Sequence, residues 1–287
     1  MNTNHLLLLT SLIITSHQAH AKLGFVDIPI AGFSESAYRI CNTTGDFGLG
    51  LSTPPSASEE NECAVYTEAM MRDVMRAPLA GYKLVAYTSK SALVPEKYVQ
   101  ADPDVATVSD TLWRNPENGF CLYGTHVQLK NITLKNGKSF ELNDVVRGGF
   151  AGKSVEAAYF FSNHPRAARE TEVVFRIGRT FTSVRHMPGD SALPKLPSKA
   201  NEKPIAIHDH EAAVNDNWVD FTTDVNPQDP DGTSYPYTST LYVKAECATA
   251  EPREYEGAIR LRSTGQGQDA IEISLPGYAP PGAIISQ

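Results

Sequence analysis

The feature that most constrains the fold is a succession of short segments rich in β-branched and aromatic residues, separated by Gly, Pro, Asn and Asp. Such segments are typical of strands, because branched side chains pack well on a pleated surface and the separating residues favour turns. Strands are expected at residues 24–28, 37–41, 82–87, 120–134, 140–146, 155–161, 172–184, 218–221, 240–246, 258–262 and 270–275. This pattern predicts a mainly β protein with a β-sandwich or jelly-roll-like architecture.

The clearest expected hairpin joins residues 120–134 to residues 140–146. Asn136 and Gly137 lie between the two segments, and both residue types tolerate the positive φ that a type I′ turn requires. Residues 89–118 contain three prolines and are expected to be irregular.

One helix is expected among the strands, near residues 58–77. Ser56 precedes Glu59 by three residues, which is the spacing of a capping box. Apolar residues follow in the stretch that leads to Pro78, and proline is a strong helix terminator.

Residues 1–21 have the pattern of a removable signal peptide. An apolar run from Leu6 to Ile14 is followed by Ala19-His20-Ala21, a small-x-small cleavage pattern. The run has about half of the roughly 20 apolar residues that a membrane-spanning helix needs. We therefore expect a mature chain that begins near Lys22, is secreted or periplasmic, and does not span a membrane.

The mature chain divides at a Pro-rich segment, residues 188–204, which is expected to be a loop or a linker. It separates a β-rich region with the one helix, residues 22–187, from a C-terminal β-rich region, residues 205–287. The sequence leaves open whether the two regions form one domain.

The formal net charge is −8. An acidic chain is poorly suited to binding nucleic acid, whose phosphates require clusters of Lys and Arg. The four cysteines predict disulfides in an exported chain. Three pairings are possible, and we favour Cys41–Cys63 with Cys121–Cys247, because the first pair is close in sequence and the second ties the middle of the chain to its end.

Two segments are candidate metal sites. Acidic and amide oxygens gather at Asp224, Asn226, Asp229 and Asp231, and oxygen ligands suit calcium, although the spacing is not that of an EF-hand. His208 and His210 are the second candidate, because residues two apart lie on one face of a strand. Turn formation and a solvated polar segment are the simpler interpretations of these two stretches.

Aromatic residues also cluster near the acidic segment, at Trp218, Tyr235, Tyr237 and Tyr242. Aromatic faces beside amides and carboxylates suit sugar rings, although such residues also fill cores. Alternation with Leu241 and Val243 predicts that Tyr242 is exposed.

These patterns favour an exported, non-catalytic β-sandwich: a surface, matrix or carbohydrate-binding module, with calcium as a candidate stabilising ion and a glycan or cell-surface component as partner. The first alternative is a secreted polysaccharide hydrolase or lyase, which requires carboxylates that converge in a concave site. The second is a structural assembly subunit, which an exposed, unpaired edge strand would favour. The sequence assigns no catalytic residue, and whether the protein is an enzyme stays open.

Overall fold

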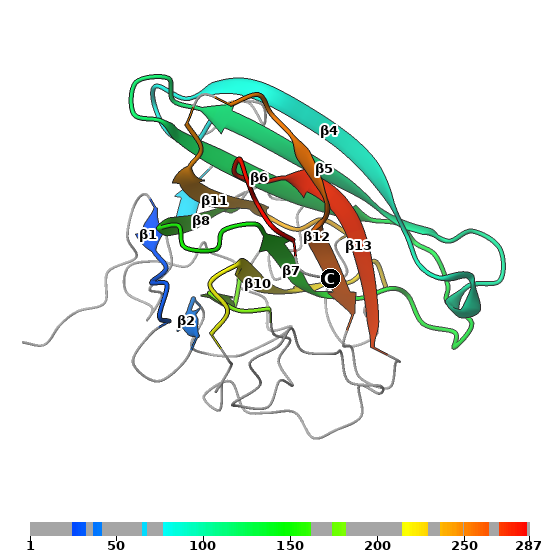
Figure 1. Ribbon diagram of the computed structural model, residues 1–287. Helices are drawn as coiled ribbons and strands as arrows, with labels where there is room; N and C mark the ends of the chain where they lie inside the picture. Colours follow the sequence, from blue (N-terminus) through cyan, green and yellow to red (C-terminus); the bar gives the residue numbers. More distant parts are fainter. Residues whose placement is uncertain are drawn as a thin grey trace, which may run out of the picture.

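The structure is a computed structural model. It describes residues 25–32, 37–41, 65–67, 77–161, 174–181, 214–228, 236–248, 250–263 and 270–285. In this part of the chain the protein is mainly β, with two antiparallel sheets that pack against each other as in a β-sandwich (Figure 1). The predicted fold class is confirmed.

The first sheet has seven strands in the order β1-β8-β11-β6-β5-β4, with β3 paired in parallel to β8. The strands are β1 (Val26–Asp27), β3 (Val65–Thr67), β4 (Lys83–Leu93), β5 (Asp104–Arg114), β6 (Phe120–Leu129), β8 (Val155–Phe161) and β11 (Thr240–Glu246). β4 and β5 form the longest hairpin, with a short 3₁₀ turn, η2 (Glu96–Tyr98), in its connection. No helix in the described residues is long and apolar enough to cross a membrane.

The second sheet has six strands in the order β13-β12-β7-β10-β9-β2. The strands are β2 (Tyr38–Ile40), β7 (Leu142–Gly148), β9 (Arg176–Gly178), β10 (Trp218–Val225), β12 (Glu254–Ser263) and β13 (Ile271–Tyr278). Strands from both sides of residues 188–204 alternate within each sheet: β11 lies between β8 and β6, and β7 lies between β12 and β10.

The core lies between the two sheets because alternate residues of each strand point inward. Tyr123 and Val243 from the first sheet belong to one buried cluster with Val145, Phe221 and Leu261 from the second. Completely burying a large apolar side chain contributes roughly 1.5–3 kcal/mol, so this cluster is the main stabilising element of the fold.

The predicted disulfide between Cys121 and Cys247 is present and joins residues 126 positions apart. Cys121 is the second residue of β6 and Cys247 directly follows β11, so the bond reinforces two strands that also pair with each other. Cys41 is disulfide-bonded as well. Its predicted partner, Cys63, lies outside the described residues.

The predicted turn at Asn136-Gly137 is present, but its type and its neighbours differ from the expectation. Gly137 has φ 81°, whereas Asn136 has no positive φ, so a type I′ turn is wrong. Amide hydrogen bonds from Gly137 to the Leu134 carbonyl and from Leu134 to the Lys138 carbonyl close the loop instead. Beyond one bridge at Thr133 and Ser139 the chain separates, and β6 enters the first sheet while β7 enters the second.

Two further predictions are corrected. The expected helix at residues 58–77 contains β3, whose backbone pairs with Tyr159–Phe161; the described residues of that segment are 65–67 and 77. A Val-Tyr-Thr sequence suits a strand, and the edge of β8 supplies hydrogen-bond partners. Residues 89–118, expected to be irregular, contain β5 and the end of β4, because the three prolines all fall between strands.

Candidate functional site

The predicted sugar-binding aromatics do not form one surface in the described structure. Trp218 and Tyr242 are both fully buried, in different sheets, and the expectation that Tyr242 is exposed is wrong. Tyr242 contacts Trp113 and Phe25, which pack over that face of the first sheet. Tyr237 is half-buried, stacks on His126 and accepts a hydrogen bond from Gln128. Tyr235 lies outside the described residues.

The predicted metal ligands are only partly described. Asn226 accepts a hydrogen bond from the Gln228 amide at 3.0 Å, so it forms a local turn. Asp229, Asp231, His208 and His210 lie outside the described residues. Within the ranges that the structure does describe, no group of three His, Cys, Asp or Glu residues is arranged to hold a metal ion.

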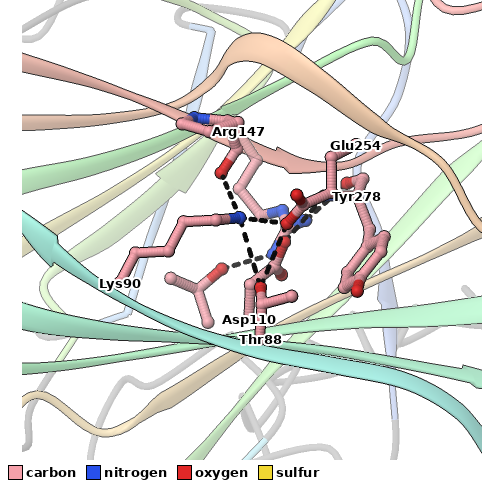
Figure 2. Close-up of polar contacts among 8 residues, drawn as sticks. Thr88, Lys90, Asp110, Arg147, Glu254 and Tyr278 are labelled. Carbon is pink, nitrogen blue, oxygen red and sulfur yellow. Dashed lines mark hydrogen bonds and ion pairs between the residues drawn. The ribbon is translucent and has the colours of Figure 1, made fainter.

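A buried polar cluster that the sequence did not predict joins the two sheets (Figure 2). Arg147 of β7 donates to Asp110 of β5 at 2.6 Å, and both side chains are almost completely buried. The same guanidinium donates to the Thr125 hydroxyl and, at 2.6 Å, to the Tyr278 carbonyl. The Tyr278 amide donates to the second Asp110 oxygen at 2.7 Å. Both carboxylate oxygens therefore have partners within the chain, one on β7 and one on β13.

Burial raises the pKa of Asp110, while the positive charge and the hydrogen bond of Arg147 act in the opposite direction. Gly277 makes this packing feasible, because a Cβ at that position would lie 2.6 Å from Ile259 and 3.2 Å from Asp110. β13 can therefore pass directly over the ion pair.

Lys90 extends this cluster toward the surface. It points inward from β4 and forms an ion pair with Glu254 of β12 (Figure 2). Its ammonium group also donates to the Thr88 hydroxyl and to the Pro276 carbonyl, each at 3.3 Å. The ammonium group of Lys90 therefore lies between the two sheets and points away from the open edge of β4.

A second buried polar row crosses the other face of the second sheet. Strand pairing places Arg176, Thr222, Asp144, Arg262 and Glu272 side by side on five successive strands. Thr222 donates to Asp144 at 3.2 Å, and Arg262 donates to Glu272 at 2.9 Å. Arg262 also lies over the Phe181 ring, 3.7 Å from its centroid.

Asp220 lies on β10 next to this row and interacts with Asp144. Tyr38 donates to Asp220 at 2.7 Å. Burial raises the pKa of Asp144 to about 6 against the positive charges of Arg176 and Arg262. Burial, and then the charge of Asp144, raise the pKa of Asp220. The two carboxyls therefore hold a proton more readily than isolated aspartates do.

The carboxyl pair lacks the access that hydrolysis needs. Asp144 and Asp220 are both 0% exposed. One oxygen of each carboxylate, and one terminal nitrogen of Arg176 and of Arg262, have no hydrogen-bond partner in the described chain. Burying these four polar atoms costs free energy that no hydrogen bond offsets. The geometry of the row is that of a buried electrostatic network rather than of a cleft.

The open edge of the first sheet is its most exposed feature. β4 ends the strand order and, among the described strands, pairs with β5 alone. It runs across the top of the molecule in Figure 1. Its exposed apolar side chains are Leu84 (44%), Val85 (39%), Tyr87 (46%) and Leu93 (53%).

Comparisons with models of protein families, with curated proteins and with solved structures found no match to this chain.

Proposed function

We propose that this chain is an exported structural protein that joins a larger assembly by pairing the edge of β4 with a strand of another polypeptide. The observation that carries the proposal is the eleven-residue length of β4 together with its exposure. Alternate backbone N–H and C=O groups of an edge strand point away from its sheet, so β4 offers a template for strand addition.

Natural edge strands carry features that prevent pairing, such as proline, outward-pointing Lys, bulges and very short length. β13, the other long edge, contains Pro276, and β1 and β2 have only two and three residues. β4 has no proline, and its regular segment, residues 86–92, contains one charge, that of Lys90. Because Lys90 is paired with Glu254, the open side of this segment is unprotected.

Export fits both the N-terminal sequence and the covalent structure. The signal-peptide pattern of residues 1–21 predicts secretion. The Cys121–Cys247 disulfide is of the kind that persists in oxidising compartments. These two features support an assembly outside the cytoplasm, in the periplasm or at the cell surface.

Carbohydrate and calcium binding stay predictions. Aromatic rings, an amide and hydroxyl groups suit a sugar, and the outer face of the first sheet carries all three. They belong to Tyr87, Tyr237, Gln128, Ser89 and Ser109. For calcium, the segment from Asp224 to Asp231 is still the candidate. Glycan-array screening with and without calcium tests both.

A labelled peptide with the sequence of residues 83–93 tests the proposed function directly. We expect saturable binding to the purified chain, measured by fluorescence anisotropy, and slower hydrogen exchange at the β4 amides in the complex. Placing lysine on the edge, as Tyr87→Lys with Ser89→Lys, should weaken binding at least about tenfold, because the peptide also carries lysines.

The matched control is the double variant Thr107→Lys with Ser109→Lys, on the same face of the adjacent interior strand β5. It changes the charge equally but leaves the edge intact, so peptide binding should persist. Circular dichroism verifies that each variant is folded. Absence of binding by the monomeric wild-type chain, or protection confined to strands other than β4, would overturn the proposed function.

A further inference from the structure

We infer that the strand that pairs with β4 is β4 of a second copy of this chain, related by a two-fold axis. This inference rests on the proposed function and names its partner. It follows from the edges that the described chain offers: β1, β2 and β3 have two or three residues, and β13 contains Pro276. Head-to-tail pairing would leave most of β4 open, whereas pairing with itself covers most of its length.

A two-fold axis makes the pairing antiparallel, and each residue then contacts a residue of the same face. Residues 86–92 are the regular part of β4, since the register with β5 shifts on both sides of them. With the axis at Ser89, Tyr87 lies opposite Ser91 of the second copy and Ala86 lies opposite Ala92. Lys90 lies opposite Thr88, so no like charges face each other.

The exposed apolar residues also fit this symmetry. Leu84 and Val85 lie at the start of β4, and Leu93 lies at its end. Antiparallel pairing brings the start of one strand to the end of the other. Each end of the interface therefore gathers Leu84 and Val85 of one copy with Leu93 of its partner copy, which removes apolar surface from water at both ends.

The dimer closes on itself because the same surface is used twice. The first sheets of the two copies join into one continuous sheet. Lys90 can keep its ion pair with Glu254, since that contact lies between the sheets of one copy. Two copies, and no longer filament, are expected from this contact.

Sedimentation velocity of the purified chain over a range of concentrations tests the inference. We expect a monomer–dimer equilibrium. The substitution Ser89→Lys should raise the dimer dissociation constant at least about tenfold, because it places two lysines opposite each other at the axis. Ser109→Lys is the matched control, since Ser109 is the neighbour of Ser89 on β5, away from the interface, and should leave the constant unchanged.

Cysteine cross-linking tests the symmetry. Ser89→Cys should give an intermolecular disulfide, because residues at the axis lie within the Cα separation that a disulfide requires. Ser109→Cys should not, since two β4 strands separate the equivalent positions. A chain that stays monomeric, with equal cross-linking of both variants, would overturn the two-fold dimer. If the β4 peptide still binds such a monomer, the proposed function survives with a different partner; if it does not, both fail.

Discussion

Asp110 and Arg147 form an ion pair that joins the two sheets of the sandwich. Their side chains are 2.6 Å apart, on β5 of the first sheet and β7 of the second, and neither has appreciable contact with solvent. A buried pair of this kind adds little net stability over an apolar pair, but breaking it leaves one buried charge without a partner.

Asp110→Ala should therefore lower the free energy of unfolding by about 3–5 kcal/mol, measured by urea denaturation. The loss arises because Arg147 stays buried and loses its counter-charge. The double variant Asp110→Ala with Arg147→Met should recover part of this loss, and the recovery measures the coupling between the two residues.

The exposed counterpart is Glu156→Gln, which breaks the half-exposed ion pair with Lys244. We expect a loss of less than about 1 kcal/mol there. If Asp110→Ala and Glu156→Gln lowered the free energy of unfolding equally, breaking the inter-sheet ion pair would cost no more than breaking a surface pair, and the prediction would be wrong.

Asp144 should make the protein more stable as the pH falls. Burial raises the pKa of its carboxyl from 3.8 to about 6 in the folded state, so between these values the folded chain binds more protons than the unfolded chain. Relative to Asp144→Asn, the wild-type chain should gain about 3 kcal/mol between about pH 8 and about pH 4. Thermal and urea unfolding at several pH values measure this difference. A difference that does not change with pH would contradict the raised pKa.

His126 should have the opposite effect. Desolvation lowers the pKa of its imidazole from 6.5 to about 4, so in this range the unfolded chain binds more protons. Stability from this residue is present above about pH 6.5 and is lost as the pH falls toward 4. His126→Gln should therefore lose less stability on acidification than the wild-type chain, by up to about 3 kcal/mol. An imidazole pKa near 6.5, measured by NMR in the folded protein, would refute this prediction.

The Cys121–Cys247 disulfide should be a major source of stability. Its ends are 126 positions apart, and closing so long a loop restricts the unfolded chain by about 5 kcal/mol in the chain-entropy model. Replacing both cysteines with alanine should lower the free energy of unfolding by about this amount and leave the folded circular dichroism spectrum unchanged. A loss of less than about 1 kcal/mol would show that β6–β11 pairing already restricts the unfolded chain.

Local sequence patterns predicted most strands correctly, and they failed where the partner of a strand had to be chosen. Asn136 and Gly137 do mark a turn, but turn residues carry no information on which sheet receives the strand on either side. The three prolines of residues 89–118 suggested irregular structure, although each of them lies between strands. Because of this error, β5 was not predicted as a strand, and Asp110 was not placed on one.

The candidate site residues were harder to predict. Trp218 and Tyr242 had the residue types of a sugar platform, but Phe181 packs on Trp218 and Trp113 packs on Tyr242, so the alternation of residues did not reveal exposure. Arg147 and Asp110 are ordinary charged residues in sequence, 37 positions apart, and no spacing rule connects them. The one sequence feature that could have indicated a buried ion pair is a charged residue in the middle of an apolar strand segment.

The sequence by itself determined the secondary structure of most strands and the turn at Gly137, because these depend on local backbone preference. It left three cysteine pairings open, and the structure shows the favoured bond between Cys121 and Cys247. Only the tertiary structure decided that β6 and β7 belong to different sheets, that Asp110 meets Arg147, and that β4 is an exposed edge. These features depend on contacts between residues far apart in the chain, and the free energy of burying charge and apolar surface is defined only once the sheets are packed.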